Sequence, residues 1–333
     1  MAIDILYLLF LQNLRIMLGG TLDEFFNALS KFAVTILPIL PYVMFWSVDK
    51  KWGYRYVTTL WSGEVINGII KLTVCAYRPW IRDERIEPAG DSKVAATGYS
   101  FPSGHTMVST AMYGTTAVKY KNESRGIFGA MIFLILLTGF SRNFLGVHTP
   151  QDVLCGLLES LFLIWIIGKA FAKFDGNDKA IDAFTIAGIL FVILTLLYIT
   201  MKPYPMDYVA GKLLVDPKVM MNDSFSACGG FTGLLLGSWI ERKKIHYVIP
   251  HGSRKLPLLT VVGSAIAFAW LELFAPATVV LAFGPHWGRF VARLILVVFA
   301  LVLYPFVIRK ACAKEAAAAS FLQAPEAEKV SVR

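Results

Sequence analysis

Charged residues are scarce in this sequence, at 17% of its 333 residues, whereas a soluble globular chain carries about 25%. Apolar residues make up 56% of the chain, and they occur in long blocks rather than in amphipathic stripes. A single soluble core could not bury that much apolar surface. The composition therefore excludes an ordinary soluble domain and predicts an all-α fold, a polytopic bundle of transmembrane helices.

Cysteine is also sparse, and the spacing of the cysteines argues against a fold held together by disulfides or by zinc. The four cysteines show no paired spacing, so neither a disulfide framework nor a zinc site is expected. The N-terminal residues lack the basic start and small-residue cleavage site of a signal peptide. Several charges among apolar residues instead predict an interfacial amphipathic segment there.

The formal net charge is +9, but the basic residues are not spread evenly. No basic face with interleaved aromatic residues is present, which argues against a nucleic-acid partner. Several of the basic residues lie in four short connectors, which the positive-inside bias assigns to the cytoplasm. These connectors are residues 49–55, 119–125, 169–179 and 241–255.

About 20 apolar residues are needed for one transmembrane helix, and the chain offers nine such stretches around a six-helix-type phosphatase core. The predicted spans lie near residues 29–48, 55–77, 103–120, 126–142, 150–172, 181–200, 225–240, 257–275 and 289–309. We divide the chain into an interfacial segment (1–28), a catalytic bundle (29–200), additional helices (201–310) and a cytoplasmic tail, disordered or a frayed helix (311–333). An odd number of spans places the N-terminus outside and the tail inside.

Three polar clusters interrupt the apolar sequence, all at span ends on the predicted non-cytoplasmic face. The first is Lys71 to Pro79, which contains Arg78. Seven residues are nearly two helical turns, so we expect Lys71 and Arg78 on one helix face about 10 Å apart, with Pro79 ending the helix. Two cations on one face near the membrane predict an anion between them.

The second cluster is Pro102-Ser103-Gly104-His105, at the start of the third span. Pro, Ser and Gly at a helix start leave backbone N–H groups free for an anion. His105 follows directly and can approach the same anion. A helix cap with an interfacial histidine would also explain this cluster taken alone.

The third cluster runs from Ser141-Arg142 to His148 and Asp152. The histidine and the aspartate are four residues apart, and Pro150 between them suits a first helical turn. This spacing lets the carboxylate fix the tautomer and orientation of the imidazole. Taken alone, a structural His–Asp pair would explain it equally well.

The order of these motifs is Lys-x6-Arg-Pro, Pro-Ser-Gly-His and Ser-Arg-x5-His-x3-Asp. This order resembles the type 2 phosphatidic acid phosphatase superfamily, which includes lipid phosphate phosphatases, glucose-6-phosphatases and the vanadium haloperoxidases. All three motifs are complete, and the resemblance covers residues 71–152.

The resemblance implies a phosphoric ester hydrolase, with His148 as the nucleophile that forms a phosphohistidine and Asp152 as its orienting partner. His105 would protonate the leaving oxygen and then activate water. The implied phosphate-binding residues are Lys71, Arg78, Ser103, Gly104 and Arg142. Fixed cations would replace metal ions, so we expect no cofactor, activity without metal, and inhibition by vanadate.

The substrate expected first is a lipid phosphate within the membrane, because a site at span ends can admit a headgroup sideways. A soluble sugar phosphate is the second candidate, and phosphotransfer to an alcohol is the third. A transporter or scaffold would leave the paired histidines unexplained. The connector at 78–102 is either a substrate rim or a solvated loop, and Glu64 is expected to neutralise a cation of the bundle.

Overall fold

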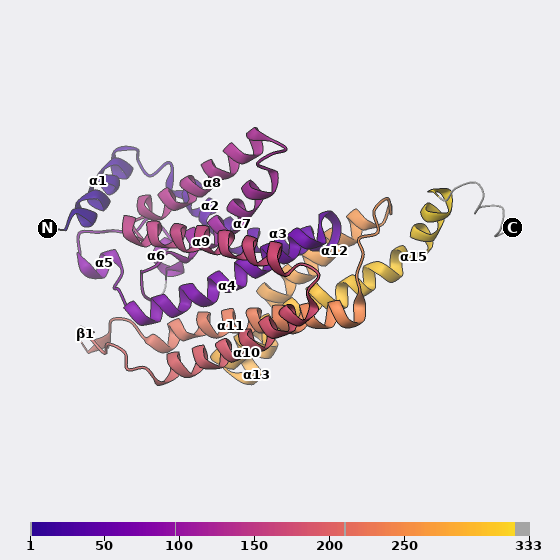
Figure 1. Ribbon diagram of the computed structural model, residues 1–333. Helices are drawn as coiled ribbons and strands as arrows, with labels where there is room; N and C mark the ends of the chain where they lie inside the picture. The colour runs from indigo at the N-terminus through magenta and orange to yellow at the C-terminus, as the bar shows by residue number, and fades with distance from the viewer. Residues whose placement is uncertain (1, 97, 210, 324–333) are drawn as a thin grey trace.

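The computed structural model describes residues 2–96, 98–209 and 211–323, and these residues form an almost entirely helical fold (Figure 1). The one sheet within them is a two-stranded antiparallel hairpin. The all-α prediction is confirmed.

The first half of the chain comprises α1 (Ile3–Met17), α2 (Asp23–Thr35), η1 (Leu37–Ile39), α3 (Leu40–Val43), η2 (Met44–Val48), α4 (Lys50–Val74), α5 (Pro79–Arg82), α6 (Ser92–Ala95), α7 (Gly104–Tyr120), α8 (Arg125–Phe144) and α9 (Pro150–Phe174). The second half comprises α10 (Asp178–Met201), β1 (Tyr208–Val209), β2 (Lys212–Leu213), α11 (Pro217–Ile240), η3 (Glu241–Ile245), α12 (Leu256–Ala269), η4 (Trp270–Phe274), η5 (Pro276–Val280), α13 (Leu281–Phe283), α14 (Pro285–Val298), η6 (Phe299–Leu303) and α15 (Tyr304–Gln323).

Six helical segments of the described chain are long and apolar enough to cross a membrane. They are Asp23–Val48, Arg125–Phe144, Pro150–Phe174, Asp178–Met201, Leu256–Phe283 and Pro285–Ala313. The other three predicted spans coincide with α4, α7 and α11. Helix α4 packs against both α7 and α11, and each of the three also contacts further helices of the bundle. Because protein surrounds these helices, they can carry polar residues that a lipid-facing helix could not. The total of nine spans stays a prediction.

Small residues let the central helices approach closely. A Cβ atom on Gly229 of α11 would lie 2.1 Å from the carbonyl oxygen of Phe290 in α14, and one on Gly156 of α9 would lie 2.6 Å from that of Ser103. Glycine is therefore required at both contacts, as is common between membrane helices. The second contact fixes α9 against the start of α7.

The predicted cytoplasmic connectors meet at one end of the bundle, where cations pair with carboxylates. Lys119 pairs with Asp49 at 3.3 Å, and Lys50 pairs with Glu241 at 2.7 Å. Arg242 pairs with Asp178 at 2.9 Å, and Lys51 pairs with Asp175. The opposite end carries α1, α5, α6 and β1 (Figure 1). We call these the paired end and the site end.

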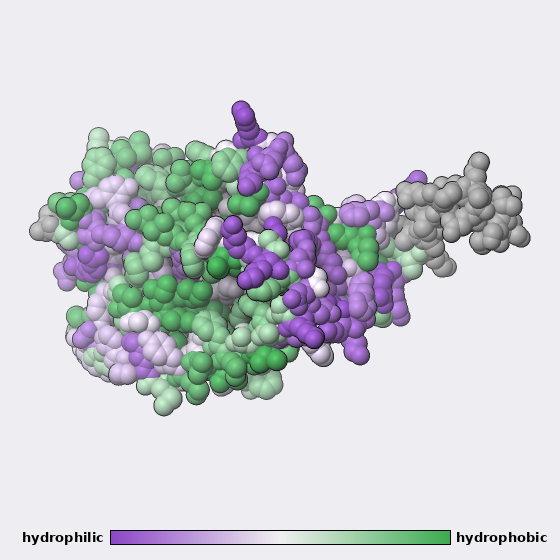
Figure 2. Space-filling view, in the orientation of Figure 1, coloured by the Kyte–Doolittle hydropathy of each residue, from purple (hydrophilic) through white to green (hydrophobic). Residues whose placement is uncertain are grey.

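The surface between the two ends is rich in exposed apolar side chains. Phe133, Leu158 and Leu194 are 56–64% exposed although they lie in long helices. On the face shown in Figure 2, hydrophobic residues cover much of the helical body, and hydrophilic residues gather toward the end from which the C-terminal helix projects. Together with the six apolar helices, this surface identifies an integral membrane protein.

Several element boundaries differ from the prediction. The first apolar segment begins at Asp23 rather than near residue 29, and α1 forms a separate helix before it. The described part of the predicted tail continues α15 as helix to Gln323, while residues 324–333 lie outside the described residues.

Candidate active site

The connector between α8 and α9 places His148 through a well-defined helix end. Gly146 adopts φ +72°, its N–H donates to the carbonyl of Asn143 at 2.9 Å, and Val147 N–H donates to the carbonyl of Arg142 at 3.2 Å. This is the Schellman arrangement, which favours glycine at the left-handed position. The Asn143 side-chain amide also donates to the carbonyl of His148 at 2.8 Å, which fixes the backbone of the histidine.

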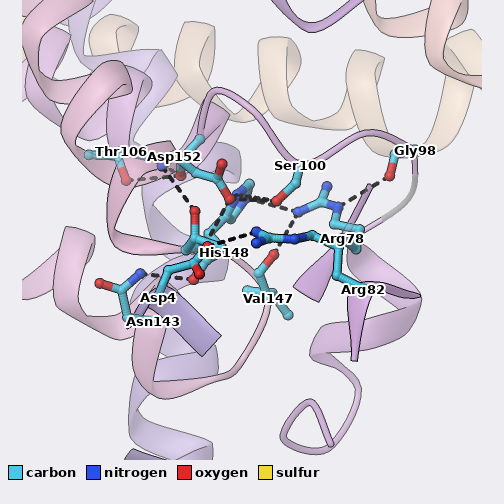
Figure 3. Close-up of polar contacts among 12 residues, drawn as sticks. Asp4, Arg78, Arg82, Gly98, Ser100, Thr106, Asn143, Val147, His148 and Asp152 are labelled. Carbon is cyan, nitrogen blue, oxygen red and sulfur yellow. Dashed lines mark hydrogen bonds and ion pairs between the residues drawn. The ribbon is translucent and has the colours of Figure 1, made fainter. Parts of the chain in front are cut away.

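Asp152 serves two purposes at the start of α9. Its carboxylate accepts the backbone N–H of Thr149 at 2.8 Å as part of a capping box, with Pro150 in the first turn as predicted. The same oxygen accepts the Ser100 hydroxyl at 2.5 Å and lies 3.3 Å from His148 Nδ1 (Figure 3). The helix cap therefore holds the carboxylate against the imidazole.

The two nitrogens of His148 face groups of opposite charge. Nε2 lies 3.0 Å from Nη1 of Arg78, and a guanidinium group can only donate. Nε2 must therefore accept, which leaves the proton on Nδ1, where the Asp152 carboxylate receives it. This tautomer presents a lone pair at Nε2, as a nucleophilic histidine requires.

The pKa of His148 lies well below its usual value of 6.5. Burial of the ring is the main cause, and the positive charge of Arg78 adds to it, while Asp152 acts in the opposite direction. Burial also lowers the pKa of Arg78 to about 10, which keeps the guanidinium charged at neutral pH. The imidazole is therefore neutral and the guanidinium positive under ordinary conditions.

The prediction that Lys71 and Arg78 share one helix face was wrong. Helix α4 ends at Val74, and Cys75 adopts a left-handed conformation with φ 53°. Arg78 follows this turn and donates to the carbonyl of Gly98 at 3.2 Å, and to that of Val147 at 3.0 Å. Both cations nevertheless line the same cavity, because the turn brings Arg78 over the end of α4.

The start of α7 lies beside this cation pair. Ser103 is the N-cap residue, and its hydroxyl oxygen accepts from the N–H of Thr106 at 3.4 Å. The first N–H groups of a helix have no partner within it. A Cβ atom on Gly104 would lie 3.9 Å from Lys71 Nζ, so the bare backbone of the helix start stands next to that ammonium group. This start can hold an anion.

Arg142 is the third buried cation of the site, and its side chain has one hydrogen-bond partner among the residues that the structure describes. Its Nη1 donates to the Ser30 hydroxyl at 2.7 Å, while its buried Nε has no partner in the described chain. Lys71 is buried as well, and no carboxylate of the described residues lies within ion-pair distance of either side chain. Buried donors without partners are costly, and an anion in the cavity would satisfy them.

A cavity of about 340 Å³ joins these groups. The predicted site residues that line it are Lys71, Arg78, Gly104, His105, Arg142 and His148. The two remaining predicted residues stand behind this lining: Ser103 caps α7, and Asp152 supports His148. The structure thus brings all eight predicted residues into one site.

The 78–102 connector covers the site and is tied down by α1. Asp4 pairs with Arg82 at 2.8 Å, and Arg15 donates to the carbonyl of Glu87 at 2.6 Å. Figure 3 draws the Asp4–Arg82 pair together with the contacts of His148. These contacts tie the described part of the connector to α1, and its Ala96 lines the cavity, which favours the substrate-rim interpretation.

Sequence reasoning missed three residues that complete the site. Ser100 holds Asp152, Ser30 holds Arg142, and Asn143 fixes the backbone of His148. Ser100 and Asn143 stand within or beside the motifs, so their polarity was a usable signal. Ser30 lies in α2, more than 100 positions from its partner, and nothing in the local sequence marks it.

Comparison with known proteins identifies the family of this segment. Residues 52–176 match the PAP2 superfamily. The chain is 26% identical to sphingosine-1-phosphate phosphatase 2 of Mus musculus over 63% of this chain and 55% of the relative. It is 27% identical to lipid phosphate phosphatase delta of Arabidopsis thaliana, over 50% and 43%. It is 35% identical to an undecaprenyl-diphosphatase of Bacillus subtilis, over 34% and 53%.

The chain spans about half the length of these relatives. No solved structure matches it. The matched segment contains every predicted site residue, from Lys71 to Asp152. The resemblance found in the motifs is thereby confirmed, and residues 52–176 belong to the PAP2 superfamily.

Proposed function

We propose that this protein is a membrane phosphatase that hydrolyses a lipid phosphate through a phosphohistidine at His148. One observation carries the proposal: His148 Nε2 faces a cavity that is lined by Lys71, Arg78 and Arg142, while Asp152 supports Nδ1. Phosphoryl transfer needs charge neutralisation and positioning more than covalent chemistry from the protein. Three fixed cations around a neutral imidazole supply both.

In the first half-reaction, the phosphate group binds the three cations, and Arg78 turns from Nε2 to a phosphate oxygen. The freed lone pair of Nε2 attacks phosphorus as the bond to the leaving oxygen breaks. His105 lines the same cavity; it takes up a proton when the negative charge of the phosphate binds beside it, and gives that proton to the leaving oxygen. In the second half-reaction, neutral His105 takes a proton from water, which attacks phosphorus and releases His148. Asp152 stabilises the charge that the imidazole gains.

A lipid substrate is favoured by the place of the site. The cavity continues from the site end into the helical bundle and is lined by apolar residues of α2 and η1, such as Val34, Pro38 and Ile39. A phosphate on the cations would leave an attached hydrocarbon chain in apolar surroundings. The relatives named for sphingosine 1-phosphate, lipid phosphate and undecaprenyl diphosphate agree with this class. The positive-inside bias supports a site on the non-cytoplasmic face.

Phosphate release by purified protein in detergent, with EDTA present, tests the proposal. The panel contains phosphatidic acid, sphingosine 1-phosphate, a polyprenyl diphosphate and glucose 6-phosphate, each with a His148→Ala control. We expect turnover of at least one lipid, its loss in the variant, and inhibition by vanadate. Turnover of glucose 6-phosphate alone would overturn the lipid assignment, and activity abolished by EDTA would overturn the metal-independent mechanism.

A further inference from the structure

The cavity extends beyond the phosphate-binding cations into the bundle, where its wall carries charges of both signs. Glu64 of α4 lies within electrostatic reach of Arg293 and Lys71, so its charge is compensated. Asn67 lies between Glu64 and Lys71 on the same face of α4 and also lines the cavity. This neutral amide has no part in the proposed chemistry so far.

The contacts of Asn67 determine which end of its amide faces the cavity. Its Nδ2 donates to the Glu159 carboxylate of α9 at 2.9 Å, and an ionised carboxylate can only accept. The amide oxygen therefore points away from Glu159. A Cβ atom on Gly104 would lie 3.7 Å from this oxygen and 3.9 Å from Lys71 Nζ.

Asn67 Oδ1 thus lies beside the start of α7 as an acceptor that lacks a donor. The side chain is buried, and the oxygen makes no hydrogen bond with any residue that the structure describes. A buried acceptor without a donor is costly. A donor that arrives during the reaction would satisfy it.

Asn67 and His148 lie on opposite sides of the phosphate position. Asn67 is about one helical turn deeper in the bundle than Lys71. Arg78, with His148 Nε2 at 3.0 Å, lies beyond the other end of α4. A group that enters or leaves phosphorus in line with Nε2 must therefore pass on the side of Asn67. His105 lines the cavity next to the same helix start.

We propose that Asn67 Oδ1 positions the water that hydrolyses the phosphohistidine, and that Glu159 holds the amide in the required orientation. This inference rests on the proposed function. Water has two O–H groups: His105 takes the proton of one, and Asn67 Oδ1 accepts a hydrogen bond from the other. The water oxygen forms a bond to phosphorus, and the P–Nε2 bond breaks with its electron pair returning to His148. The second proton stays on the product phosphate.

This role distinguishes water from every other group that reacts on this side of the phosphate. The leaving oxygen of the lipid carries no O–H group when its bond to phosphorus breaks, and it needs only the proton from His105. An alcohol acceptor such as methanol carries a single O–H group, which His105 also serves. Formation of the phosphohistidine and its transfer to methanol therefore do not need Asn67, whereas hydrolysis does.

The test follows the phosphate of a ³²P-labelled lipid that the protein hydrolyses, with and without methanol. Asn67→Leu removes the acceptor and leaves a side chain of similar volume. We expect the variant to form phosphohistidine at the wild-type rate, while hydrolysis of the intermediate slows about 10- to 100-fold. The ratio of methyl phosphate to inorganic phosphate should rise by the same factor.

Two further variants separate this role from a general loss of structure. Glu159→Leu should raise the same ratio by a smaller factor, because an amide without its partner can rotate. Asn222→Leu changes a half-buried asparagine of α11 that does not line the cavity, and it should leave the ratio unchanged. Melting temperatures verify that each variant is folded.

Two results would overturn the proposal. One is hydrolysis of the intermediate at the wild-type rate in Asn67→Leu. The other is equal slowing of both half-reactions with an unchanged ratio, which would assign Asn67 to the support of Lys71. If Asn67→Leu does not fold, an unchanged ratio in Glu159→Leu overturns the proposal instead. Failure of the proposed function has a different signature, because wild-type protein would then carry no label on His148.

Discussion

The two ends of the bundle treat positive charge in opposite ways. At the paired end, Lys50 meets Glu241, and Arg242 meets Asp178. At the site end, Lys71 and Arg142 are buried without a carboxylate partner among the described residues, and one nitrogen of Arg142 has no hydrogen bond. Paired cations contribute to the fold. Buried cations without a carboxylate partner are energetically unfavourable until an anion binds beside them. Phosphate should therefore bind at the site end.

Exposure to solvent accounts for part of this difference. The basic residues of the paired end lie in connectors, where the exposed pairs, such as Arg242–Asp178, contribute little to stability and only the pair of Lys50 with the buried Glu241 contributes much. The site cations lie under a rim that α1 holds in place through the Asp4–Arg82 pair. Exclusion of water strengthens each interaction with a bound anion. Lysine and arginine therefore have different roles at the two ends of the bundle because their surroundings differ.

The largest effect should come from the histidines. We expect His148→Ala to lower phosphatase activity by roughly 10⁴-fold or more, because removal of a nucleophile leaves only binding and electrostatics. His251, an exposed residue in the turn after Ile249, is the matched control, and His251→Ala should leave activity unchanged. Phosphate release with saturating substrate measures both. Comparable losses in the two variants would contradict the contrast between the ends.

Substitution of Arg142 and of Arg242 should also have different effects on activity, by a smaller factor than the histidine substitutions. Arg142→Met removes a charge that faces the cavity, and we expect activity to fall about 10²- to 10³-fold, as for other groups that stabilise a transition-state anion. Arg242→Met removes a charge from the paired end, and activity should stay within about twofold, because its partners Asp178 and Asp182 lie far from the site in the bundle. Values of kcat/KM for the same lipid give the comparison. Equal losses would show that the site cations have no special role.

The stability of the fold should depend on the paired end rather than on the site end, which is the reverse of the expectation for activity. Glu241 is buried and accepts from Lys50, Tyr54 and the backbone of Tyr247, so Glu241→Leu should lower the free energy of unfolding by roughly 3 kcal/mol. Lys71→Met removes a buried charge that has no ion-pair partner, and it should raise the melting temperature while it impairs activity. Thermal unfolding in detergent without phosphate measures both. A destabilised Lys71→Met protein would mean that the cation supports the fold.

The smallest expected effect is the absence of a titration. Because burial and Arg78 hold the pKa of His148 well below 6.5, its imidazole should stay neutral as the pH falls from 8 to 6. A histidine with its pKa lowered in the folded state favours the neutral form, so protonation should begin only at lower pH. ¹⁵N-histidine NMR measures this, with the His148→Ala spectrum for assignment. A His148 signal that titrates near pH 6.5 would contradict the charge arrangement of the site.

Much of the site could be predicted because its residues lie in short motifs. The His148–Asp152 pair is four residues apart with Pro150 between them, and this local spacing determines the capping box. The helical fold followed from apolar blocks, which need no knowledge of tertiary contacts. Six of the predicted spans overlap the six helical segments of the described chain that are long and apolar enough to cross a membrane.

The errors and omissions arose where tertiary contacts decide the structure. The end of α4 was placed at Pro79, but Cys75 turns left-handed, which neither glycine nor proline signalled. Ser30 reaches Arg142 from a distant helix. The pairing of basic connectors with Glu241, Asp49 and Asp175 also joins distant segments. One sequence without its fold cannot determine such contacts.

The most direct test of the account is detection of the covalent intermediate. Protein would be mixed with a ³²P-labelled lipid phosphate that it hydrolyses and quenched in alkali, which preserves phosphohistidine, and the labelled peptide would be identified by mass spectrometry. The account predicts label on the peptide that contains His148 and none in the His148→Ala protein. Label on another residue, or turnover that persists in His148→Ala, would contradict it.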